Sequence, residues 1–133
     1  MIAPGRPGLT IEAFEAGNVD ASAFDHAAHV HVGWLYLRRY PLALAIERFT
    51  DALQRLTRQL GAADKYHETI TCFFLLLIAE RRAEAPAESW AAFRARNADL
   101  FSAGPLLRRY YLQQTLNSER ARRSFVLPDR LAA

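Results

Sequence analysis

The chain has 133 residues, 51% of them hydrophobic and 23% charged, so it is long enough to bury a core and lacks the composition of a disordered protein. Its 17 basic residues, nearly all arginine, exceed its 14 acidic residues by a formal charge of +3. The arginines are scattered over several segments without a concentrated basic face, so the sequence speaks against nucleic-acid binding as the main role.

Apolar spacing, capping residues and helix breakers predict a succession of helices over residues 10–16, 24–39, 41–60, 64–83, 88–98, 104–116 and 118–125. Gly17 and Gly61 are expected to end two of these helices in the left-handed conformation. Pro41 separates the second helix from the third, and Asp20 or Ser22 is the expected N-cap of the second. The alternating pattern of a β-strand is not present, and neither is an internal repeat.

The fourth predicted helix is apolar on every side in its middle, residues 72–79, which predicts a central helix covered by the others. This apolar run is about half the length that a membrane span needs, so we expect no membrane insertion. The predicted fold class is all-α. We expect a single domain over residues 1–133, a helical bundle of about five to seven helices, with residues 1–9 and 128–133 as extended or poorly ordered ends.

The single cysteine and the first eight residues indicate the cellular compartment of the protein. Cys72 is the one cysteine and lies in the apolar run, which indicates a buried thiol with no internal disulfide. Residues 1–8 are rich in proline and glycine and lack the apolar segment of a secretory signal. The expectation is a soluble, cytoplasmic protein.

The four histidines fall in two short motifs, residues 24–31 and 65–69. His26 and His29 are three residues apart and share one face of the second helix, whereas His31 points elsewhere. Short loops make consecutive helices antiparallel, so the second and fourth helices should run parallel. His67, placed in the first turn of the fourth helix, should then lie at the same end as His26 and His29. We therefore expect these three histidines to converge on one polar site.

Imidazole is the commonest transition-metal ligand, and three histidines with an open position are typical of a catalytic metal site. The sequence therefore predicts a divalent transition metal, iron or zinc, held by His26, His29 and His67. Glu68 is the candidate catalytic base or fourth ligand, with Asp25 as another carboxylate, and Tyr66 is a second catalytic candidate at the mouth of the site. In the alternative interpretation, each histidine is a core residue bonded to a backbone carbonyl and no metal binds.

Both histidine motifs lie near helix N-termini, where the positive end of the helix dipole favours neutral imidazoles and an anionic substrate. Arg109 and Tyr110 are the candidate substrate-binding residues for such an anion. The alternative for this segment is a solvated basic face beside packed aromatic rings.

Several motifs together resemble an uncharacterised family of small bacterial all-helical proteins. They are Phe24-x-His26-x-x-His29, Trp34-Leu-Tyr-Leu37, Lys65-Tyr-His67-Glu-Thr69, Arg109-Tyr-Tyr111, Ser118, Ala121-Arg122 and Pro128-Asp129. The resemblance implies a polar site shared at the positions of His26, His29 and His67, without His31. It implies no activity that can be transferred.

Two functions of different classes follow. The first is a small metal-dependent enzyme that acts on a small molecule, and one form of this hypothesis has an anionic substrate. The second is a non-catalytic helical binding or regulatory module in which the histidines form a structural core network. An electrostatic binder using the arginines is a third and weaker hypothesis. The expected partners are a small-molecule ligand and, for assembly, a second copy in a homodimer, with neither nucleic acid nor membrane.

Overall fold

The computed structural model describes residues 9–20 and 24–130, and these residues form helices and loops without a β-strand. The described helices are α1 (Ile11–Glu15), α2 (His26–Arg39), α3 (Leu42–Gln59), η1 (Ala63–Lys65), α4 (Glu68–Ala83), α5 (Trp90–Arg96), η2 (Ala98–Phe101), α6 (Ala103–Arg108), α7 (Gln113–Leu116) and α8 (Glu119–Arg123). The all-α prediction is confirmed for this part of the chain.

Most helix boundaries follow from local chemistry. Five helices begin with a side chain that accepts a hydrogen bond from a backbone N–H of the first turn, and the capping residues are Thr10, Asp25, His67, Ser89 and Ser118. Gly17 and Gly61 follow α1 and α3 with φ of +76° and +68°, the left-handed conformation expected of them. The prediction that Asp20 caps α2 was wrong, because the helix begins at His26 and its N-cap is Asp25. Ser22 lies outside the described residues.

The start of α4 differs from the prediction. The chain forms the short helix η1, continues through an extended Tyr66, and begins α4 at Glu68 with His67 as N-cap. Nδ1 of His67 accepts a hydrogen bond from the N–H of Ile70 at 3.1 Å. Histidine is an uncommon N-cap, so sequence patterns place the start of the helix at Asp64 instead.

The predicted helix over residues 104–116 is broken into α6 and α7. The break is stabilised by Asp129, whose carboxylate accepts hydrogen bonds from the N–H of Leu112 at 3.0 Å and from the hydroxyl of Thr115. This cap comes from a residue far along the chain, so local sequence does not predict the break.

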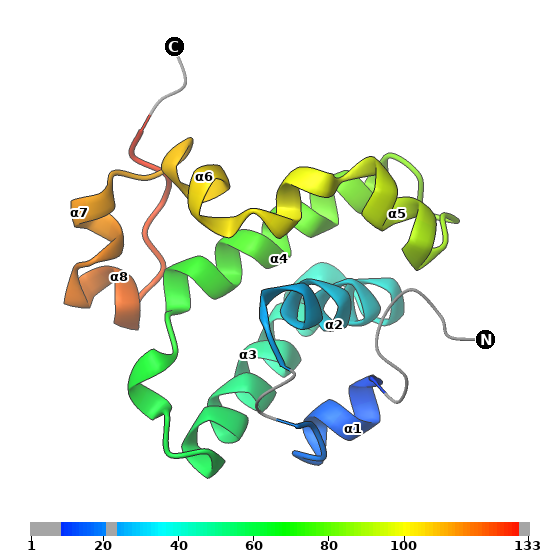
Figure 1. Ribbon diagram of the computed structural model, residues 1–133, viewed down its shortest axis with the longest axis horizontal. Helices are drawn as coiled ribbons and strands as arrows, with labels where there is room; N and C mark the ends of the chain where they lie inside the picture. Colours follow the sequence, from blue (N-terminus) through cyan, green and yellow to red (C-terminus); the bar gives the residue numbers. More distant parts are fainter. Residues whose placement is uncertain (1–8, 21–23, 131–133) are drawn as a thin grey trace.

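α4 is flanked by α2 and α3 on one side and by α8 on the other (Figure 1). The ring of His26 contacts Phe74 with centroids 4.8 Å apart, and the carbonyl of Leu37 accepts a 3.4 Å hydrogen bond from Arg82. Residue numbers therefore rise together along the two helices, which shows that α2 and α4 run parallel as expected. The buried side chains form a core whose largest members include Trp34, Tyr36, Phe14, Phe93 and Tyr111.

The described residues after α8 form an extended segment that passes the start of α4 and continues toward α6 (Figure 1). The buried hydroxyl of Thr69 donates to the carbonyl of Ser124 at 2.8 Å and accepts from the N–H of Val126 at 3.1 Å. The hydroxyl of Tyr111 donates to the carbonyl of Val126 at 2.6 Å. The N–H of Arg130 donates to the carbonyl of Tyr110 at 2.9 Å. Residues 128–130 are thus bonded to the helices, and residues 131–133 lie outside the described part.

Candidate functional site

A cavity of about 60 Å³ lies between α2 and α4 and is open on one side. Its polar lining groups are His26, His29 and Thr71, and its apolar lining residues are Val30, Phe49, Ile70, Phe74, Leu75 and Ile78. Two imidazoles and a hydroxyl from two different helices therefore meet on one otherwise hydrophobic surface.

His26 is held by a contact across the fold. Its Nε2 lies 2.8 Å from the carbonyl oxygen of Leu100 in η2. Because a carbonyl oxygen only accepts, Nε2 is the donor of this hydrogen bond. The edge contact with Phe74 restricts the ring further, so the orientation of this imidazole is determined by two neighbours.

His29 faces the cavity beside the ring of Phe24, with centroids 4.5 Å apart. Burial is the main cause that lowers the pKa of His29 to about 4, and the charge of His26 lowers it further, while Asp25 acts in the opposite direction. Its imidazole is therefore neutral at pH 7. Neither of its ring nitrogens bonds to another residue in the described part of the chain, so both can serve a ligand.

The two residues predicted as catalytic, Glu68 and Tyr66, lie near Thr71. The hydroxyl of Tyr66 donates to Oε1 of Glu68 at 2.5 Å. Burial, with Glu68 as the next cause, raises the pKa of Tyr66, whereas a hydrogen bond from Thr71 lowers it. Burial and the neighbouring Glu68 also raise the pKa of the Cys72 thiol to about 12, so this cysteine is not a thiolate. Glu68 and Tyr66 thus lie together, and neither lines the cavity.

His67 is not among the residues that line the cavity. Its Nδ1 caps α4, and its Nε2 lies 2.7 Å from the carbonyl oxygen of Leu116, so both ring nitrogens are occupied. The axial register explains the separation. His26 lies level with Phe74, seven residues beyond His67, and at 1.5 Å per residue this offset is about 10 Å along the helix.

The described residues contain no group of three or more histidine, cysteine, aspartate or glutamate side chains that could hold a metal ion. His26 and His29 share the cavity, and His67 bonds elsewhere. The metal site formed by three histidines stays a prediction, and the positions of these histidines do not support it.

Arg109 and Tyr110 lie away from the cavity. The guanidinium of Arg109 is exposed, 3.9 Å from Asp99 and above the ring of Tyr110. The ring of Tyr110 packs on Phe73, with centroids 4.9 Å apart. This arrangement matches the alternative of a solvated basic face beside packed rings.

Sequence reasoning did not find three groups that contact the cavity or the predicted site residues. Phe49 of α3 closes part of the cavity, and its position in the apolar seam of that helix indicated burial but not this contact. The carbonyls of Leu100 and Leu116, which bind His26 and His67, have no signal in the sequence because every residue carries a carbonyl. His31 lies apart from the cavity, stacked on Trp90 with centroids 4.2 Å apart.

No helix in the described part of the chain combines the length and the hydropathy that crossing a membrane requires. Comparisons with protein-family models, with curated proteins and with solved structures find no match, so the proposals below rest on the geometry of the cavity.

Proposed function

We propose that this protein binds a small molecule in the cavity between α2 and α4, within a single helical bundle organised around α4. His29 is the observation that supports this proposal most directly. It faces the cavity as a neutral imidazole, and neither ring nitrogen bonds to a described residue. A ligand that donates or accepts one hydrogen bond can pair with this ring in place of water.

The dimensions and the charge of the cavity limit the ligand. A volume of about 60 Å³ is well below the ~150 Å³ of an apolar cavity that holds benzene, so the enclosed part of the ligand has only a few heavy atoms. Burial and the neighbouring His26 both disfavour positive charge at His29, and the same conditions disfavour a cation in the cavity. We expect a small neutral or anionic group, either a whole molecule or the end of a larger one.

A metal-dependent enzyme is the second candidate, and the orientation of His26 favours it. Histidines that ligate metals commonly donate their other ring N–H to a carbonyl or carboxylate, as His26 does toward Leu100. In this candidate, His26 and His29 supply two nitrogen ligands to iron or zinc, and substrate and water supply the others. Tyr66 and Glu68, which bond to each other near Thr71, would hold a proton beside the site.

Two-dimensional NMR of the full chain tests the binding proposal, with acetamide, acetate and methylammonium as neutral, anionic and cationic probes. Acetamide or acetate should shift the resonances of His29 and Thr71 in a saturable manner, and methylammonium should not. Thr71→Val and His29→Phe should each weaken this binding at least tenfold. Thr57→Val is the matched control, because the Thr57 hydroxyl bonds to the carbonyl of Gln54 within α3. Absence of any saturable shift, or equal binding by both cavity variants, would overturn the proposal.

Zinc and iron(II) titrations of untagged protein separate the two candidates. The enzyme candidate predicts one bound equivalent that His29→Phe abolishes and that His67→Asn leaves in place. Binding of acetamide or acetate without stoichiometric metal supports the non-catalytic binding module and rejects the metal-dependent enzyme.

A further inference from the structure

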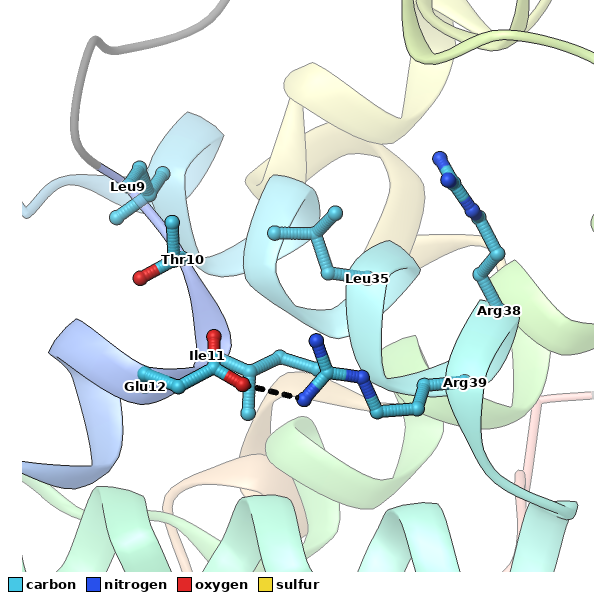
Figure 2. Close-up of a pocket in the computed structure, with 7 residues that line it drawn as sticks. All are labelled: Leu9, Thr10, Ile11, Glu12, Leu35, Arg38 and Arg39. Atoms are coloured by element: carbon cyan, nitrogen blue, oxygen red, sulfur yellow. Dashed lines mark hydrogen bonds and ion pairs between the residues drawn. The ribbon is translucent and has the colours of Figure 1, made fainter.

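A second and larger cavity, of about 360 Å³, lies between the start of α1 and the last turns of α2. Ligand pockets in proteins are commonly about 300 to 1,000 Å³, so this cavity has room for a whole small molecule. Seven residues line it: Leu9, Thr10, Ile11, Glu12, Leu35, Arg38 and Arg39. Figure 2 shows Leu9 and Thr10 on one side, the two arginines on the other, and Leu35 between them.

The charged groups of this cavity carry a net positive charge, since two guanidinium groups and one carboxylate belong to its lining residues. Nη1 of Arg39 donates to Oε2 of Glu12 at 2.6 Å, the contact drawn as a dashed line in Figure 2. This contact occupies one of the five N–H donors of the Arg39 guanidinium. Arg38 forms no ion pair with any carboxylate in the described part of the chain, and its guanidinium lies 5.3 Å from the centroid of the Trp34 ring.

The remaining lining groups favour a ligand with one polar end. The hydroxyl oxygen of Thr10 accepts from the N–H of Ala13 and so bonds within the first turn of α1. Leu9 and Leu35 supply apolar surface across from each other (Figure 2). Hydrogen-bond donors with excess positive charge, set beside aliphatic side chains, match a carboxylate that carries a short hydrocarbon chain.

We propose that this cavity is a binding site for a small amphipathic carboxylate, with the carboxylate on Arg38 and the hydrocarbon chain against Leu35 and Leu9. The site is separate from the histidine cavity and does not depend on the function proposed there. A ligand bound in it bridges α1 to α2 and stabilises the folded chain in proportion to its occupancy.

Calorimetric titration of the full chain tests the proposal, with hexanoate, 1-hexanol and hexylammonium as probes that share a six-carbon chain and differ in the head group. Hexanoate should bind at least tenfold more tightly than the other two, and its affinity should fall as salt is added. Hexanol or hexylammonium binding as tightly as hexanoate, or no binding of hexanoate at its solubility limit, would overturn the proposal.

Variants identify the contacts. Arg38→Gln changes an exposed side chain, so the fold should persist, and it should weaken hexanoate binding at least tenfold while leaving hexanol unaffected. Arg120→Gln is the matched control, because it removes an exposed arginine from α8, and it should leave hexanoate binding unchanged. His29→Phe should also leave it unchanged, which keeps this result distinct from that of the histidine cavity. Unaltered affinity in Arg38→Gln would show that the arginine does not hold the carboxylate.

Discussion

Two histidines stabilise the fold through backbone carbonyls of distant segments. His26 bonds to Leu100, and His67 bonds to Leu116 while it also caps α4. His29 differs, because it faces a cavity and its ring nitrogens bond to no described residue. At the scale of the residue, the same side chain therefore has two roles: His26 and His67 make structural contacts, and His29 is available to bind a ligand.

Replacing His67 by alanine removes both contacts. The lost N-cap and the lost hydrogen bond to Leu116 should together lower the free energy of unfolding by about 2 kcal/mol. His67→Asn keeps an acceptor at the N-cap but is too short to reach Leu116, so it should recover about half of the loss. Urea denaturation at pH 7 measures both values, and full stability in His67→Ala would show that these bonds contribute nothing.

The pH dependence of stability follows from two half-buried histidines. Burial is the main cause that lowers the pKa of both His29 and His31 to about 4, from an ordinary value of 6.5. Between pH 4 and pH 6.5 the unfolded chain binds more protons than the folded chain. The free energy of unfolding therefore has its full value above pH 6.5 and decreases as the pH drops toward 4.

Unfolding measured across this pH range checks the effect. His29→Phe and His31→Phe should each reduce the slope of stability against pH by up to one proton, and the double variant by up to two. A slope that neither variant changes would mean that these imidazoles are as basic in the folded chain as in the unfolded one.

At the scale of the element, the crossing of α2 and α4 depends on Gly33. A Cβ atom at this position would lie 3.1 Å from Cδ2 of Leu75 and 3.5 Å from Cδ1 of Ile78. The glycine therefore allows close approach of the two helices. Leu75 and Ile78 also line the histidine cavity, so the spacing of the helices and the shape of the cavity are linked.

Gly33→Val should destabilise the protein by about 1 to 3 kcal/mol, because the added methyl groups overpack a buried contact. The same substitution at Gly104 is the control, since a Cβ there meets only the flexible end of Arg108. Thermal unfolding compares the two variants. An equal loss of stability in both variants would show that the helix propensity of valine, and not the crossing of α2 and α4, causes the loss.

At the scale of the whole molecule, the segment after α8 joins the C-terminal helices to the start of α4. Thr69 is fully buried and supplies two of the joining hydrogen bonds, to Ser124 and Val126. Asp129 completes the connection by capping α7. The C-terminal segment is thus joined to α4 and α7 through side chains that lie far apart in sequence.

Thr69→Val should remove both hydrogen bonds and lower the free energy of unfolding by about 2 kcal/mol. Thr69→Ser keeps the hydroxyl and should lose much less. Hydrogen exchange at the amide of Val126 is the specific measurement, and it should accelerate in the valine variant. Unchanged exchange there would place the stabilising contacts of this segment elsewhere.

Much of the local structure could be predicted because its causes are local. The left-handed stops at Gly17 and Gly61 and the shared face of His26 and His29 follow from residues within one or two helical turns. The parallel direction of α2 and α4 also followed, because short connections reverse the chain twice. The start of α4 did not, because His67 is an uncommon cap.

The sequence by itself determined that the described chain is helical, where most of its helices stop, and which residues share a helix face. Only the tertiary structure decided the axial register of α2 against α4, which places His26 beside Phe74 and leaves His67 beside Leu116. The physical reason is that hydrophobic periodicity specifies which face of a helix is buried, whereas the offset between two helices depends on how side chains such as Leu75 and Ile78 pack around Gly33.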